Sequence, residues 1–169
     1  MLLELHKELG IPEDFAHPGS APLFEEASEL VEVGPNLVGR MQRLAPAAAG
    51  QWLSMVDAAA GHNVALMIVS GFRGYEYQAG LIRRKLDSGQ VIEDILCVNA
   101  APGYSEHHTG RAVDVATPGS RPLTEEFEDT DAFRWLSQHA ETYGFSMSYP
   151  RDNPHGFIYE PWHWAFRDG

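Results

Sequence analysis

The sequence predicts an α+β fold in which a small, mainly antiparallel sheet is flanked by helices. Three segments have the apolar spacing of amphipathic helices, and several short apolar runs have the length of strands. These segments do not alternate as they would in a regular βαβ series, which disfavours a parallel sheet. At 169 residues, we expect a single domain over residues 1–169 with a substantial buried core.

The elements are expected in the following order. Residues 30–33 and 37–38 are predicted to be strands on either side of a turn that contains glycine and proline. Pro46 favours the first turn of a helix, and Gly61 suits its end. Further strands are expected at residues 64–69, 112–116, 145–148 and 162–166, further helices at residues 75–86 and 132–143, and either state at residues 91–96.

Charge and composition limit the classes of partner. The formal net charge of −12 argues against binding to nucleic acid or to an anionic membrane. No apolar run approaches the roughly 18 residues needed for membrane insertion, and residues 1–8 lack the features of a signal peptide. The sequence as it stands therefore predicts a cytoplasmic protein, or a periplasmic or cell-wall protein if a leader was removed. The single Cys97 excludes an intramolecular disulfide and is expected to be a buried thiol.

Two segments together carry the residues of a metal site. The first, SEHHTGRAVD, runs from Ser105 to Asp114, and the second, EPWH, runs from Glu160 to His163. A catalytic zinc typically takes three protein ligands and leaves a fourth position open for water. We expect one zinc ion per chain, bound by His107, Asp114 and His163, with Glu160 left free to transfer protons.

The spacing within the first segment has two interpretations. His107 and Asp114 are seven residues apart, so a continuous helix would place them on one face. Gly110 interrupts such a helix, however, and the valines of residues 112–116 favour a short strand with Asp114 on one face. His108 is expected to point away from the metal. A surface loop with two histidines is the simpler alternative for this segment alone, and no HExxH signature is present.

The combined pattern SxHxxGxAxD followed by ExWH resembles the VanY-type D-alanyl-D-alanine carboxypeptidases, which are zinc peptidases of bacterial cell-wall metabolism. The segment SGFR, which ends at Arg73 and is followed by Gln78, resembles the SGYR…Q segment of the family, with Phe72 in place of a frequent tyrosine. The APGY segment before Ser105 also fits the family pattern. The resemblance covers roughly residues 38–163, and about residues 1–30 form an N-terminal extension of unknown role.

The resemblance implies a single-zinc peptidase fold that removes the terminal D-Ala of peptidoglycan stem peptides or precursors. Zinc would acidify its bound water and polarise the carbonyl, and Glu160 would serve as the general base. Arg73 would pair with the substrate carboxylate or help stabilise the oxyanion. Gln78 and Ser105 resemble substrate-contacting residues of the family. The simpler alternatives are an exposed glutamate at Glu160, a surface salt bridge at Arg73 and a capping hydroxyl at Ser105.

Other functions fit the same scaffold. They include an L,D-carboxypeptidase, a D-Ala-D-Ala dipeptidase and a cell-wall endopeptidase. A non-catalytic zinc-containing binding module is a further alternative, because hedgehog signalling domains resemble this scaffold. Glu160 and Arg73 disfavour it, since a pure binding module needs neither. The sequence carries no signal for the oligomeric state.

Overall fold

The structure is a computed structural model that describes residues 1–15 and 21–168. Its centre is a four-stranded antiparallel sheet in the order β3–β4–β6–β5. The strands are β3 (Met67–Ser70), β4 (Ala112–Ala116), β5 (Phe145–Met147) and β6 (His163–Phe166). A separate antiparallel pair is formed by β1 (Val31–Pro35) and β2 (Met41–Leu44). Together with the helices, these sheets confirm the predicted α+β class.

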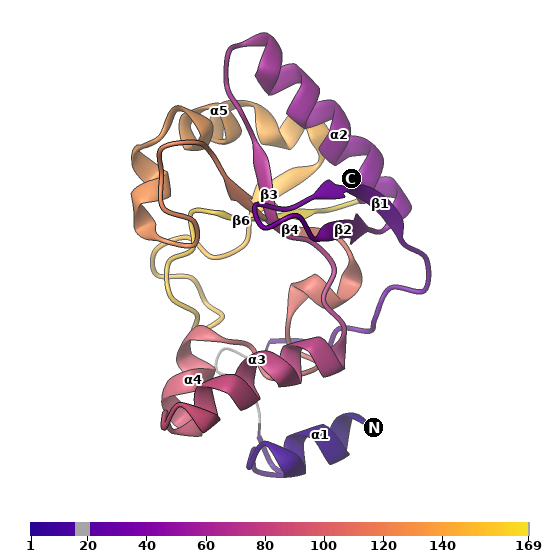
Figure 1. The fold of residues 1–169 in the computed structure, drawn as a ribbon, viewed down its shortest axis with the longest axis vertical. Coiled ribbons are helices and arrows are strands. Elements are labelled where there is room, and N and C mark those ends of the chain that lie inside the picture. The colour runs from indigo at the N-terminus through magenta and orange to yellow at the C-terminus, as the bar shows by residue number, and fades with distance from the viewer. Residues whose placement is uncertain (16–20, 169) are drawn as a thin grey trace.

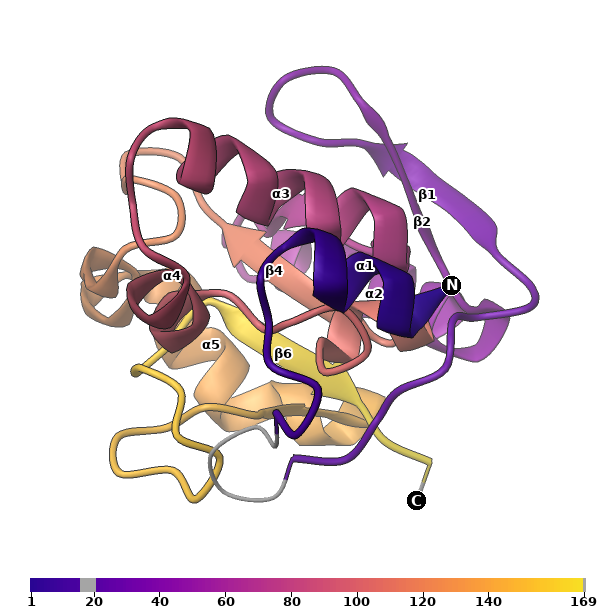
Figure 2. The ribbon, with the colours of Figure 1, turned by 90° about the horizontal axis from the view of Figure 1, so that it is seen from below.

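Helices lie at both ends of the molecule, with the sheet between them (Figure 1). At one end are α2 (Pro46–Gly61) and α5 (Asp131–His139), and at the other are α1 (Leu2–Glu8), α3 (Tyr75–Asp87) and α4 (Ile92–Val98). Figure 2 shows α1 beside α3, with β4 and β6 behind them. Short 3₁₀ helices occur at η2 (Glu106–Thr109), η3 (Glu125–Asp129) and η4 (Ala140–Tyr143).

Two apolar clusters hold these layers together. The larger one joins the sheet to α2 and α5, with Met55, Val113 and Leu136 almost completely buried within it. The smaller one joins α1, α3 and α4 through residues that include Leu5, Ile82 and Ile95. The first helix is therefore packed against the helix that follows the SGFR segment.

The extension before residue 30 is attached by polar contacts as well. The Arg83 guanidinium donates to both carboxylate oxygens of Glu8, at 2.6 and 2.8 Å. The backbone N–H of Ala27 donates to His108 O at 2.8 Å, which ties this segment to the loop that carries the predicted metal ligand. The N-terminal segment thus supports both α3 and the site loop.

The structure shifts some of the predicted elements. The second strand of the N-terminal pair is β2, so its prediction at residues 37–38 was wrong. The Asn36 carboxamide oxygen accepts from the backbone of Val38 and Arg40, and Gly39 has φ +80°, which together lengthen the turn. The ambiguous residues 91–96 fall in the helix α4, where Cys97 is exposed, contrary to the prediction of a buried thiol.

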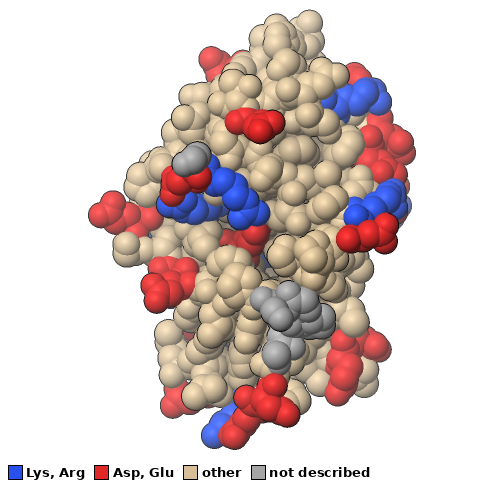
Figure 3. Space-filling view, turned by 180° about the vertical axis from the view of Figure 1, so that it is seen from behind, with Lys and Arg blue, Asp and Glu red and all other residues tan. Residues whose placement is uncertain are grey.

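Acidic side chains are spread over the face shown in Figure 3, and most basic groups there lie beside acidic ones. None of the helices in the described part of the chain is long and apolar enough to cross a membrane.

Candidate active site

The three predicted metal ligands meet at the sheet. Asp114 on β4 pairs directly with His163 on β6, so their side chains lie side by side on one face. His107 comes from η2, the turn that leads into β4. One possible ligand atom from each of these buried residues lies within 4.8 Å of the others. The strand interpretation of residues 112–116 is therefore confirmed.

Two glycines allow this approach of chain segments. Gly110 ends η2 with φ +66°, and a Cβ atom there would lie 2.8 Å from the backbone nitrogen of Ala45. A Cβ atom on Gly71 would lie 2.7 Å from Arg43 O. Both glycines belong to the motifs noted in the sequence, and larger residues would push the site loops away from β2 and from the start of α2.

The hydrogen bonds of His107 leave one ring nitrogen free for a metal. Its Nδ1 lies 2.7 Å from Gly71 O, which can only accept, so Nδ1 carries the proton. Burial lowers the pKa of His107 and keeps the ring neutral. The lone pair of Nε2 then faces Asp114 Oδ1 at 3.2 Å. Two acceptors this close repel each other unless a cation lies between them, and a metal ion fits that position.

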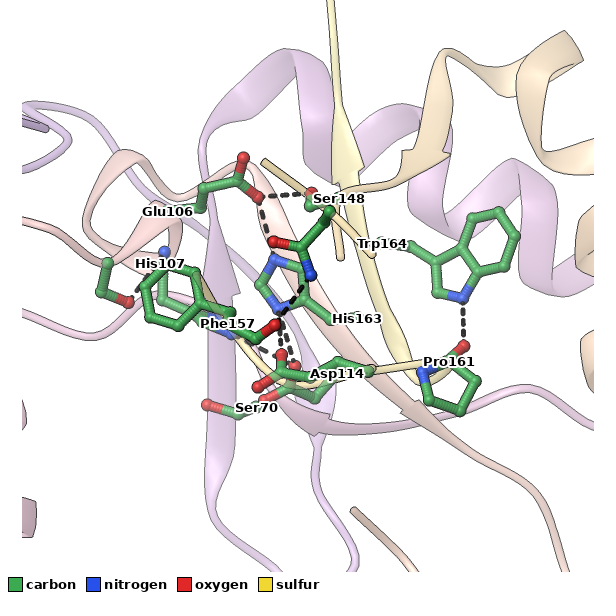
Figure 4. Close-up of polar contacts among 12 residues, drawn as sticks. Ser70, Glu106, His107, Asp114, Ser148, Phe157, Pro161, His163 and Trp164 are labelled. Atoms are coloured by element: carbon green, nitrogen blue, oxygen red, sulfur yellow. Dashed lines mark hydrogen bonds and ion pairs between the residues drawn. The ribbon is translucent and has the colours of Figure 1, made fainter. Parts of the chain in front are cut away.

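His163 is oriented by a buried carboxylate, Glu106. Its Nε2 lies 2.9 Å from Glu106 Oε2, while Nδ1 lies 3.2 Å from Asp114 Oδ1 (Figure 4). Burial lowers the pKa of His163, but hydrogen bonds to the two carboxylates outweigh it and raise this pKa to about 10. With both ring nitrogens protonated, Nδ1 donates its proton to Asp114. A metal ion bound there would take the place of that proton.

The sequence reasoning missed Glu106. Ser148 Oγ donates to its Oε2 at 2.6 Å, and Arg167 Nη2 donates to its Oε1 at 3.1 Å. Burial raises the pKa of Glu106, but the hydrogen bonds from His163 and Ser148 outweigh it and lower the pKa to about 2. In the sequence, the position of Glu106 directly before His107 could have indicated its role. Glu106 thus carries a negative charge against the outer nitrogen of His163.

Glu160 lies beside the cluster, and none of its atoms is among the three candidate ligand atoms. Its Oε2 is 3.7 Å from His163 Nδ1, and its side chain is only 15% exposed. Burial raises the pKa of Glu160 to about 7. A carboxylate with this pKa can accept a proton and return it near neutral pH.

Arg73 follows β3 in a loop that is fixed by backbone contacts. Its N–H donates to His107 O at 3.1 Å, and its carbonyl accepts from His108 Nδ1 at 2.6 Å. His108 Nε2 in turn accepts from the N–H of Gly103 at 3.0 Å. Burial lowers the pKa of His108 to about 4, so the neutral ring holds both contacts. His108 therefore points away from the metal cluster, as expected, and holds the arginine loop.

Two buried polar atoms on the cavity wall lack partners among the described residues. Arg73 Nη1 lies 3.6 Å from Asp114 Oδ2, but Arg73 Nε has no hydrogen-bond acceptor. Gln78 Nε2 donates to Ala100 O at 2.8 Å, which leaves Gln78 Oε1 without a donor. Buried groups of this kind are costly unless a ligand satisfies them. Both side chains border the cavity, so a modest turn of either would present its unsatisfied atom to a bound molecule.

Ser105 serves as a cap and also borders the cavity. Its Oγ accepts from the N–H of His107 at 3.3 Å, which starts η2. The capping interpretation of this hydroxyl is therefore confirmed, and its contact with a substrate stays a prediction.

The three candidate metal ligands, Glu160 and Arg73 border one cavity of about 260 Å³. Its wall includes every site residue named from the sequence: Arg73, Gln78, Ser105, His107, Asp114, Glu160 and His163. The apolar side chains of Leu123, Phe157, Ile158 and Trp162 form another part of the wall. The arrangement brings a cluster that could hold a metal ion, a carboxyl group with a raised pKa and a cation into one cavity.

Comparisons with known proteins agree with this geometry. The sequence model of the VanY family, described as D-alanyl-D-alanine carboxypeptidase, matches residues 41–168. The putative carboxypeptidase YodJ of Bacillus subtilis (strain 168) is 34% identical over 113 residues, which are 65% of this chain and 41% of that protein. The bifunctional D-Ala-D-Ala dipeptidase and carboxypeptidase VanXYC of Enterococcus gallinarum is 32% identical over 128 residues, 73% of this chain and 66% of its own length. The chain thus spans less than half of the first of these relatives.

Solved structures show the same fold. The LdcB LD-carboxypeptidase superposes with a TM-score of 0.75 at 30% identity, over 88% of this chain and 71% of the other. The E175A mutant of the D,D-pentapeptidase VanY from a VanB-type cassette, solved in complex with Zn(II), has a TM-score of 0.66 at 24% identity. This second match covers 90% of this chain and 86% of the other, and it shows the fold alone. From the family match over residues 41–168, together with the shared fold, the chain belongs to the VanY family of D-alanyl-D-alanine carboxypeptidases.

Proposed function

We propose that this chain is a zinc-dependent carboxypeptidase that removes the terminal D-Ala of peptidoglycan stem peptides or their precursors. The observation that carries the proposal is the buried cluster of His107, Asp114 and His163, which shares one cavity with Glu160 and Arg73. When bound, zinc would acidify a water molecule and polarise the scissile carbonyl. Two neutral imidazoles and one carboxylate suit zinc, because they leave the ion a net positive charge.

The chain's own residues would prepare the ligands for that ion. Gly71 O holds His107 with Nε2 toward Asp114, and Glu106 holds His163 with Nδ1 toward Asp114. Partners of this kind fix the tautomer and the ring orientation of a metal-binding histidine. Glu106 thus acts as a positioning residue for His163.

Glu160 would accept the proton of the attacking water and return it to the leaving amine. Its place beside the cluster, outside the ligand set, and its raised pKa support this role. A positioned acid–base group contributes roughly 10²–10⁴-fold to the rate.

Arg73 would bind the free C-terminal carboxylate of the peptide. Its guanidinium borders the cavity with Nη1 3.6 Å from Asp114, and its fixed loop holds this donor close to the metal cluster. Gln78 Oε1 would accept from a peptide N–H, and Ser105 lies on the same wall. A free terminal carboxylate is the feature that separates a carboxypeptidase substrate from an endopeptidase substrate.

L,D-carboxypeptidase activity is the second candidate. It is favoured by the similarity to the LdcB LD-carboxypeptidase at a TM-score of 0.75. The two candidates differ in the residue before the scissile bond, which is D-Ala in a pentapeptide and an L-amino acid in a tetrapeptide.

The test measures loss of the terminal residue, by mass spectrometry of the shortened peptide, from stem pentapeptides and tetrapeptides treated with the zinc-loaded protein, each with a free or an amidated C-terminus. The proposal expects cleavage of the pentapeptide acid and not of its amide. Preference for the tetrapeptide acid would establish the second candidate, and equal cleavage of acids and amides would contradict both.

A further inference from the structure

The cavity contains a second cation, Lys85, which no part of the proposed mechanism uses. Lys85 and Gln78 are seven residues apart on α3, so they lie on the same face of the helix. Seven helical residues rise about 10 Å, which equals the length of about three extended peptide residues. Lys85 is half-buried and donates to the side-chain oxygen of Asn99, another wall residue.

Lys85 has no acidic partner in the described part of the chain, although the sequence contains 24 acidic residues. The carboxylates that border the cavity are Glu106, Asp114 and Glu160. All three lie within 4 Å of His163, at the metal end of the cavity. The positive charge of Lys85 therefore faces the cavity without compensation.

We propose that Lys85, with Asn99, binds a carboxylate of the peptide on the N-terminal side of the scissile bond. This inference rests on the proposed function, in which Arg73 binds the C-terminal carboxylate. Arg73 precedes α3, whereas Lys85 lies in its last turn. Both residues line the same cavity, so a peptide anchored at Arg73 can extend along it toward Lys85.

Peptidoglycan stem peptides supply such a carboxylate in two places. D-Glutamate that is linked through its side chain keeps a free α-carboxylate, two residues before the D-Ala-D-Ala unit. Diaminopimelate, where it occupies the intervening position, carries a carboxylate at the end of its side chain. In an extended peptide both groups can lie about 10 Å from the terminal residue, which matches the rise between Gln78 and Lys85.

The simpler alternative is that Lys85 only stabilises the C-terminal end of α3. Cations in the last turn of a helix interact favourably with its dipole. Arg84 is adjacent, lies in the same turn and is exposed outside the cavity wall. It therefore provides a matched control, because it shares the helix position and differs in its access to the cavity.

The experiment measures kcat/KM of the zinc-loaded protein for four pentapeptides. The D-glutamate carries either a free α-carboxylate or its amide, and the third residue is either diaminopimelate or lysine. The variants are Lys85→Met, Lys85→Arg and Arg84→Met. At the position that is bound, we expect the wild-type protein to prefer the peptide with the carboxylate over the peptide that lacks it by roughly tenfold, the scale of one charge-assisted hydrogen bond at a half-buried site.

Lys85→Met should reduce this preference to about one, Lys85→Arg should retain it, and Arg84→Met should match the wild type. The position at which the preference occurs identifies the carboxylate that is bound. If the wild-type protein cleaves all four peptides equally, or if Arg84→Met loses the preference as Lys85→Met does, the inference is wrong and the proposed function stands. If the wild-type protein cleaves none of the peptides, both are wrong.

Discussion

Glu106→Gln should weaken zinc binding by about tenfold without removing a ligand. In this variant the amide oxygen can occupy the position of Oε2 and still accept from His163 and Ser148. The amide nitrogen would then face Arg167, which is 54% exposed and can turn into solvent. What is lost is the negative charge against the imidazole, and charge-assisted hydrogen bonds are about twice as strong as neutral ones.

The size of the expected loss in zinc affinity follows from the role of Glu106, which holds the imidazole of His163. Mutating the hydrogen-bond partner of a metal-binding histidine typically costs 10–100-fold in metal affinity or activity, or about 1.4–2.7 kcal/mol. Because Glu106→Gln keeps the hydrogen bond, its loss should lie near the lower end of this range. Glu106→Ala removes the acceptor and should lie near the upper end.

The assay is competition for zinc with a chromophoric chelator, with the dissociation constant compared between variants. Glu128→Gln is the matched control, since Glu128 pairs with Arg151 at the surface, 3.0 Å away. Thermal unfolding of the metal-free variants separates loss of affinity from loss of fold. An unchanged zinc affinity in Glu106→Gln, or an equal loss in Glu128→Gln, would refute the assignment of Glu106 as a positioning residue.

Three other substitutions test the remaining roles. Asp114→Ala should reduce the zinc content from about one equivalent to nearly none, because it removes a ligand that faces both histidines. Elemental analysis measures this content, and full occupancy would overturn the ligand set. Glu160→Gln should keep the zinc but lose at least about 10²-fold in turnover, measured by D-Ala release, and an active variant would exclude Glu160 as the base. Arg73→Lys should lose roughly 10-fold or more in kcat/KM toward peptide acids, because an ammonium lacks the two-pronged contact with a carboxylate; an unchanged kcat/KM would show that Arg73 does not bind the terminus.

The motifs were informative about the site because each residue type serves a local need. Gly110 must adopt a positive φ, and the valines beside Asp114 fill the core on the opposite face of β4. These requirements can be recognised from the sequence alone. They placed the metal-bearing strand correctly, and the α2 prediction succeeded for a similar reason, since Pro46 and Gly61 mark its bounds.

The contacts that sequence reasoning missed join distant parts of the chain. Glu106 is linked to Ser148 and Arg167, which lie 42 and 61 residues away. Lys85 could be recognised as a cavity residue only after α3 and α4 were placed. The position of β2 was missed for a different reason, because the side-chain hydrogen bonds of Asn36 extend the turn beyond its glycine and proline.

The direct pairing of Asp114 with His163 across two core strands has a consequence for how the protein acquires its ion. Two of the three proposed ligands are placed by the sheet itself, so we expect the chain to fold before it binds the ion, unlike zinc fingers, which remain unfolded without metal. Chelation should then yield a folded apoprotein that can be recharged. A nitrogen and oxygen donor set also has affinity for cobalt, nickel and copper. Which ion occupies the site in the cell therefore depends on the metal supply at the place where the chain folds.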